Sequence, residues 1–98
     1  MSIVEFEDRN SMVKSLVSQH GKYAEIGVLA GEFSKDLYSI LKPTELILID
    51  LFEGDTGSGD QDGNNFKMYN LNRCYLDIAA HYKANPEVIM IKGTAWRL

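Results

Sequence analysis

The chain has 98 residues, of which 45% are hydrophobic and 24% charged, and its formal net charge at pH 7 is −4. This composition is typical of a globular domain, and the acidic balance disfavours a phosphate backbone as the main partner. No apolar run approaches the roughly 20 residues that cross a membrane, and the single Cys74 cannot form an internal disulfide. We therefore expect one cytoplasmic domain that binds neither nucleic acid nor membrane.

The first half of the chain predicts a helix and then a strand. A helix is expected over residues 8–19, with Asn10 or Ser11 as its cap and Gly21 as its stop. Its apolar positions recur at helical spacing: Met12, Val13, Leu16 and Val17. Residues 23–28 then predict a short buried strand.

A second helix and a second strand follow. The helix is expected over residues 31–41 and ends before Pro43. Residues 45–50 form a nearly unbroken apolar run closed by an acid, which predicts a central parallel strand buried on both faces.

The remaining elements are a loop, a helix and a strand. Residues 53–65 contain four glycines and four acids and predict a loop. A helix is expected over residues 65–84, and its candidate core residues are Phe66, Tyr69, Tyr75, Ile78, Ala79 and Tyr82. Residues 88–91 predict a third strand. The alternation of helices and strands favours an α/β fold with a parallel sheet.

The turn after the first strand carries the candidate chemistry. Gly27 and Gly31 permit a tight turn and close approach of a ligand to the N-terminus of the next helix. Asp50 ends the second strand, 23 residues after Gly27, where an acid hydrogen-bonds ribose hydroxyls in doubly wound sheets. Leu29 stands where dinucleotide sites place a middle glycine, and Glu25 would repel a pyrophosphate but attract an ammonium group.

These residues resemble the first motifs of class I S-adenosylmethionine-dependent methyltransferases, and the stretches 25–34 and 48–54 are most similar to the branch that methylates oxygen of small molecules or sugars. Glu25-x-Gly27-x-x-x-Gly31 matches the first motif, and Lys92-Gly93-Thr94 resembles the exit of strand 3. The resemblance departs at Leu29, where many members have glycine, and at Thr94, where an acid is common.

The resemblance implies a Rossmann-like three-layer sandwich and S-adenosylmethionine as cofactor. The cofactor-binding residues that it implies are Glu25, Gly27, Val28, Gly31, Phe33, Ser34, Asp50, Leu51, Gly93 and Thr94. It also implies that residues 1–98 form a single half-domain with an N-terminal helix. This half-domain would hold strands 1–3 of the seven-stranded sheet in the order 3-2-1, without a counterpart of the family's C-terminal half. The general base would belong to that half, so no catalytic residue is assigned here.

Three alternatives stay open. The turn could bind another nucleotide such as NAD, or the chain could be a non-catalytic interaction or assembly module. Self-association or a complementing chain would cover the open edge of strand 1. A small-molecule acceptor is the expected partner of an enzyme. The acids Asp55, Asp60 and Asp62 lack the spacing of a calcium loop, so we expect a solvated loop or substrate lid and no metal.

Overall fold

The structure is a computed structural model that describes the backbone of residues 1–58 and 67–93, and the side chains of residues 1–55 and 68–93. The sequence predictions that fall on Asp60, Asp62, Phe66 and Thr94 lie outside the described residues. The elements in chain order are α1 (Arg9–Leu16), β1 (Lys22–Ile26), α2 (Glu32–Leu41), β2 (Glu45–Asp50), β3 (Asp55–Ser58), β4 (Lys67–Asn70), α3 (Leu71–His81) and β5 (Val88–Lys92).

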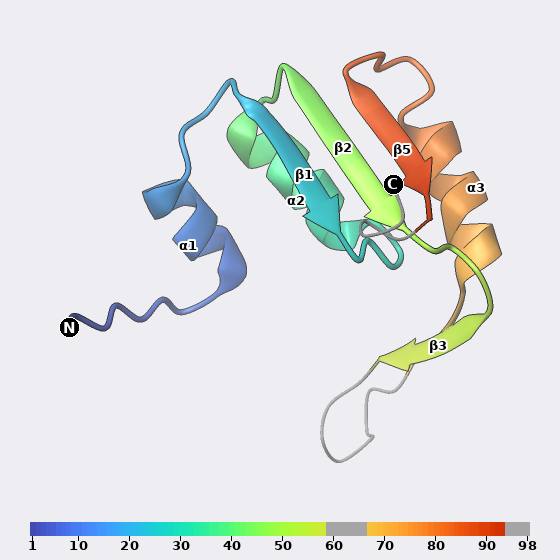
Figure 1. Cartoon of the computed structure of the whole chain (residues 1–98), viewed down its shortest axis with the longest axis horizontal. Coiled ribbons are helices and arrows are strands. Elements are labelled where there is room, and N and C mark those ends of the chain that lie inside the picture. Colours follow the sequence, from blue (N-terminus) through green and yellow to red (C-terminus); the bar gives the residue numbers. More distant parts are fainter. Residues whose placement is uncertain (59–66, 94–98) are drawn as a thin grey trace.

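The main sheet is parallel and has three strands in the spatial order β1-β2-β5. Helices α2 and α3 lie side by side on one face of this sheet, and α1 lies beyond β1, next to α2 (Figure 1). The predicted α/β class is confirmed, and this arrangement is compatible with a Rossmann-like fold.

The core lies between the sheet and the two helices behind it. Leu46 and Leu48 of β2 are fully buried and pack in one cluster with side chains from α3 and from the segment after β2. The buried members of that cluster are Val28, Leu46, Leu48, Phe52, Ile78 and Tyr82. A second cluster of Val13, Leu37 and Leu41 fixes α1 against α2.

The opposite face of the sheet is less covered. Ala24 and Ile26 of β1 are exposed, and Ile26 retains 65% of its accessible surface. The predicted burial of the first strand is therefore wrong, because the described helices pack on the other face only. The predicted burial of β2 on both faces agrees better with the structure. On this second face Ile47 is half-buried and Ile49 is buried.

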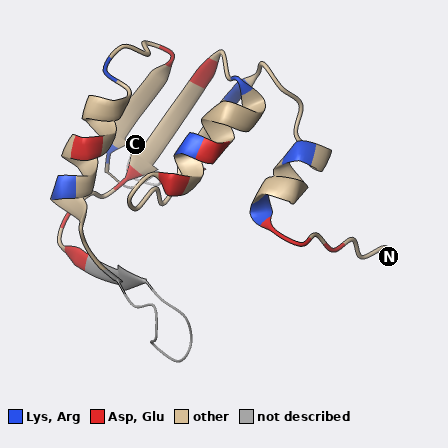
Figure 2. Cartoon of the chain, turned by 180° about the vertical axis from the view of Figure 1, so that it is seen from behind, with Lys and Arg blue, Asp and Glu red and all other residues tan. Residues whose placement is uncertain are grey.

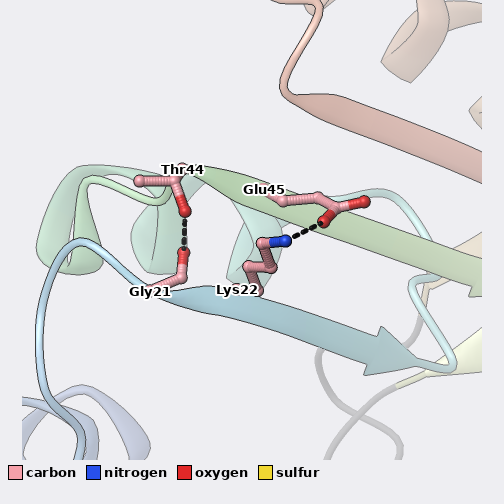
Figure 3. Close-up of polar contacts among 4 residues, drawn as sticks. All are labelled: Gly21, Lys22, Thr44 and Glu45. Atoms are coloured by element: carbon pink, nitrogen blue, oxygen red, sulfur yellow. Dashed lines mark hydrogen bonds and ion pairs between the residues drawn. The ribbon is translucent and has the colours of Figure 1, made fainter.

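Polar contacts join the beginnings of β1 and β2 (Figure 3). The Thr44 hydroxyl donates a 3.1 Å hydrogen bond to the Gly21 carbonyl, and Lys22 forms a 3.8 Å ion pair with Glu45. The Lys22 side chain is largely exposed, so this ion pair contributes little to stability. Lys22 and Glu45 lie opposite each other in the parallel register of β1 and β2, which brings their side chains together.

Helix α1 differs from the prediction in its N-cap and in where it ends. The Asp8 carboxylate accepts a 2.7 Å hydrogen bond from the Ser11 backbone N–H, which makes Asp8 the N-cap in place of Asn10 or Ser11. The helix ends at Leu16, before the predicted stop at Gly21. Asp8 satisfies one of the free N–H groups of the first turn, as N-cap carboxylates do.

The segment between β2 and α3 also differs from prediction. Asp55–Ser58 and Lys67–Asn70 pair as an antiparallel ribbon, whereas a loop over 53–65 and a helix from 65 were expected. Asn70 accepts a 2.8 Å hydrogen bond from the Arg73 N–H and so fixes the start of α3 at Leu71. Tyr69 consequently belongs to β4, not to the helix core, and Ala79 is exposed.

Candidate functional site

The turn between β1 and α2 has an unusual backbone. Gly27, Leu29 and Gly31 all have positive φ angles, at 84°, 56° and 81°. Glycine adopts this region freely, whereas for leucine it costs about 1–2 kcal/mol. The turn therefore holds Leu29 in a conformation that glycine adopts more readily.

The two glycines of the turn have different roles. A Cβ at Gly31 would lie 2.9 Å from the Ile78 side chain of α3, so this glycine permits close packing. A Cβ at Gly27 would meet nothing within 4 Å. Gly27 therefore faces open space, where a ligand can approach the backbone.

Asp50 joins the strand end to this turn. Its Oδ2 accepts hydrogen bonds from the backbone N–H groups of Val28 (2.7 Å) and Leu29 (3.0 Å). Its Oδ1 accepts a 3.2 Å hydrogen bond from the Phe52 N–H. The carboxylate thus holds the β1–α2 turn and the segment after β2 in fixed relative positions.

This bonding limits what else Asp50 can bind. A carboxylate offers about four acceptor positions, and three of those of Asp50 are in use. One position, on Oδ1, remains for an external donor such as a sugar hydroxyl. Binding two hydroxyls at once would require one of the backbone bonds to break.

Glu25 lies beside the turn on the helix-covered face of β1. Its carboxylate accepts a 2.5 Å hydrogen bond from the fully buried Ser34 hydroxyl at the start of α2. Burial raises the pKa of Glu25, although the bond from Ser34 and the charge of Arg9 act in the opposite direction. The group is therefore a half-buried acid whose orientation is fixed by its hydrogen bond to α2.

A pocket of about 300 Å³ opens at this turn. Its lining residues come from the end of β1, the turn after it, the first turn of α2, the start of α1 and β4: Arg9, Glu25, Gly27, Val28, Leu29, Ala30, Glu32, Phe33 and Tyr69. The pocket contains two carboxylates and one guanidinium, so it suits a ligand that carries both signs of charge with a positive excess.

The structure brings some of the predicted residues together and separates others. Glu25, Gly27, Val28 and Phe33 line the pocket. Gly31 and Ser34 are buried just behind it, where they pack and orient Glu25. Asp50 reaches the turn through its hydrogen bonds, whereas Leu51 is exposed outside the lining and Gly93 follows β5 at the same edge of the sheet.

Sequence reasoning missed Arg9, Glu32 and Tyr69. Glu32 directly follows the second glycine of the motif, so its place in the first turn of α2 was a usable signal. Arg9 and Tyr69 come from α1 and β4, far along the chain from the motif. No local pattern indicates that these two residues meet the turn, because the contact depends on tertiary packing.

Among residues 1–58 and 67–93, no group of three or more His, Cys, Asp or Glu side chains could hold a metal ion. No helix in this same part of the chain is long and apolar enough to cross a membrane.

A scan of protein-family models and searches of curated proteins and of solved structures found no match to this chain.

Proposed function

We propose that this chain is the S-adenosylmethionine-binding half of a class I methyltransferase that transfers a methyl group to oxygen of a small molecule or sugar. In this proposal β1, β2 and β5 correspond to strands 1, 2 and 3 of the seven-stranded methyltransferase sheet, in the order 3-2-1, and the protein works in the cytoplasm. The main support is the pocket at the β1–α2 turn, where open space at Gly27 adjoins the carboxylate of Glu25.

The chemistry of the turn favours this ligand over a dinucleotide. A pyrophosphate binds to the free N–H groups of such a turn. Here Asp50 already accepts from the N–H groups of Val28 and Leu29, so a phosphate would have to displace a carboxylate. It would also lie near Glu25 and Glu32, which line the same pocket. A ligand with an ammonium group and no phosphate avoids both costs.

The residues present fit such a ligand in size and charge. The pocket volume is at the lower end of the range for small-molecule sites, which suits the amino-acid end of the cofactor. Glu25 would hold the ammonium group, and Gly27 would allow the chain of the ligand to pass close to the backbone. Asp50 would accept one ribose hydroxyl at its remaining position, and Leu51 lies at the same strand end for contact with the adenine.

When bound, the cofactor supplies an activated methyl group on a positively charged sulfur. The part of this chain in catalysis is to bind and orient, since holding a nucleophile and a methyl group in line lowers the barrier substantially. Glu25 and Glu32 also favour a cation in the pocket. We assign no general base to the described residues.

A second candidate function is supported by a separate observation. The exposed Ala24 and Ile26 on the second face of the sheet suit an interaction or assembly module. The two functions are compatible if a partner surface covers this face while the pocket stays open. A chain that serves only as an interaction module would bind no nucleoside in the pocket, and this difference distinguishes the two functions.

Calorimetric titration with S-adenosylmethionine, S-adenosylhomocysteine and NAD tests the proposal. We expect saturable binding of the first two and none of NAD. Glu25→Gln should weaken binding of both about tenfold or more, because it removes the charge opposite the ammonium. Glu45→Gln, an acid at the other end of the sheet, is the matched control and should bind normally. Saturable binding of NAD alone would exclude the proposed function.

A further inference from the structure

The first residue of α1 lies at the candidate site. The Arg9 guanidinium sits over the ring of Phe33, 4.1 Å from the guanidinium carbon to the ring centroid, and both residues line the pocket. Stacking on an aromatic ring restrains the guanidinium and leaves its edge N–H groups free to donate. The two ion pairs found among the described side chains, Lys22 with Glu45 and Arg73 with Asp77, do not use Arg9.

Arg9 and Glu25 present opposite charges to the same pocket without touching. Both line it, and their charged atoms form no ion pair within 4.0 Å among the described residues. Their charges nevertheless interact, because the positive charge of Arg9 opposes the rise in the pKa of Glu25 that burial causes. A guanidinium and a carboxylate separated in this way match a ligand that carries a carboxylate and an ammonium group on neighbouring atoms.

We propose that Arg9 binds the carboxylate of an α-amino-acid group while Glu25 binds its ammonium, so that the pocket recognises the zwitterionic end of the ligand. This inference rests on the proposed function and adds α1 to the binding site. It assigns Phe33 as the residue that positions the Arg9 guanidinium. Glu32, the other acid in the lining, disfavours a ligand carboxylate elsewhere in the pocket and so restricts it to the side of Arg9.

A comparison of three nucleosides isolates the contribution of the ligand carboxylate to the binding affinity. S-adenosylhomocysteine carries both groups, its decarboxylated analogue keeps only the ammonium, and 5′-methylthioadenosine has neither. We expect the full-length chain to bind S-adenosylhomocysteine at least tenfold more tightly than the decarboxylated analogue at pH 7. Arg9→Gln should abolish this preference by weakening the binding of S-adenosylhomocysteine alone. Arg9→Lys should keep part of the preference because the positive charge remains.

Lys14→Gln, on the same helix but outside this pocket, is the control and should retain the preference. Phe33→Leu keeps the Arg9 guanidinium but removes the aromatic ring on which it stacks. This variant should reduce the preference for S-adenosylhomocysteine by several fold. Equal weakening of all three nucleosides by Arg9→Gln, or no weakening, overturns the role of Arg9 while leaving the proposed function intact. Absence of binding by all three nucleosides overturns both. Circular dichroism of each variant shows whether α1 still folds.

Discussion

Two glycines that look equivalent in the sequence differ in what surrounds them. Gly31→Ala should destabilise the chain by roughly 2–4 kcal/mol, because it adds a clash with Ile78 to the cost of a positive φ. Gly27→Ala should cost only about 1–2 kcal/mol, since its Cβ enters open space. Urea denaturation of the two variants measures the difference. Equal losses would mean that the packing against Ile78 relaxes freely.

The part-buried hydrogen bond between Ser34 and Glu25 gives a pH-dependent prediction. The pKa of Glu25 is raised in the folded chain, so its favourable contribution is complete below its ordinary value of 4.5 and is lost as pH rises through the folded-state pKa. Ser34→Ala removes a bond to the charged form and should raise this pKa further. We expect a loss of about 1–3 kcal/mol at pH 7 and a smaller loss at pH 4. Ser39→Ala, exposed on the same helix, should show neither effect.

At the scale of elements, Asp50 connects two turns at the carboxyl edge of the sheet. Asp50→Asn keeps one acceptor oxygen but places an NH₂ group against backbone donors, so we expect a loss of roughly 2–3 kcal/mol. Amide hydrogen exchange at Val28 and Leu29 should accelerate. Asp77→Asn, which removes an exposed ion pair with Arg73, should cost under about 0.5 kcal/mol. Similar losses in both variants would show that Asp50 does not support the turn.

The sequence predicted best those elements whose pattern is local. The apolar run 45–50 coincides with β2, because a buried parallel strand is hydrophobic throughout. The glycine-rich segment before α3 was predicted as a loop, and its β3–β4 pairing could not be seen because β propensity is low there and pairing depends on a distant segment. The same limit applies to the pocket. Glu25 and Gly27 were predicted from a local motif, whereas Arg9 reaches the pocket only through the packing of α1, which the sequence pattern does not reveal.

At the scale of the whole molecule, helices α2 and α3 lie on one side of the sheet (Figure 2), and the opposite side carries exposed aliphatic side chains such as that of Ile26. Uncovered apolar sheet surface promotes association. We expect the chain to self-associate with rising concentration in sedimentation velocity. Ile26→Lys should shift it towards monomer, whereas Leu16→Lys, of similar exposure on α1, should not. A monomer at all concentrations would mean that this face stays solvated.

The central claim is that the β1–α2 turn binds the methyl donor, and chemical-shift mapping tests it most directly. Titration of the ¹⁵N-labelled chain with S-adenosylhomocysteine should shift the backbone amides of Gly27, Leu29 and Phe33 together with that of Phe52, in a saturable manner. Amides at the opposite end of the sheet, such as Lys22, should not respond. Saturable shifts confined to amides outside this turn, or shifts at the turn with NAD and none with S-adenosylhomocysteine, would contradict the account.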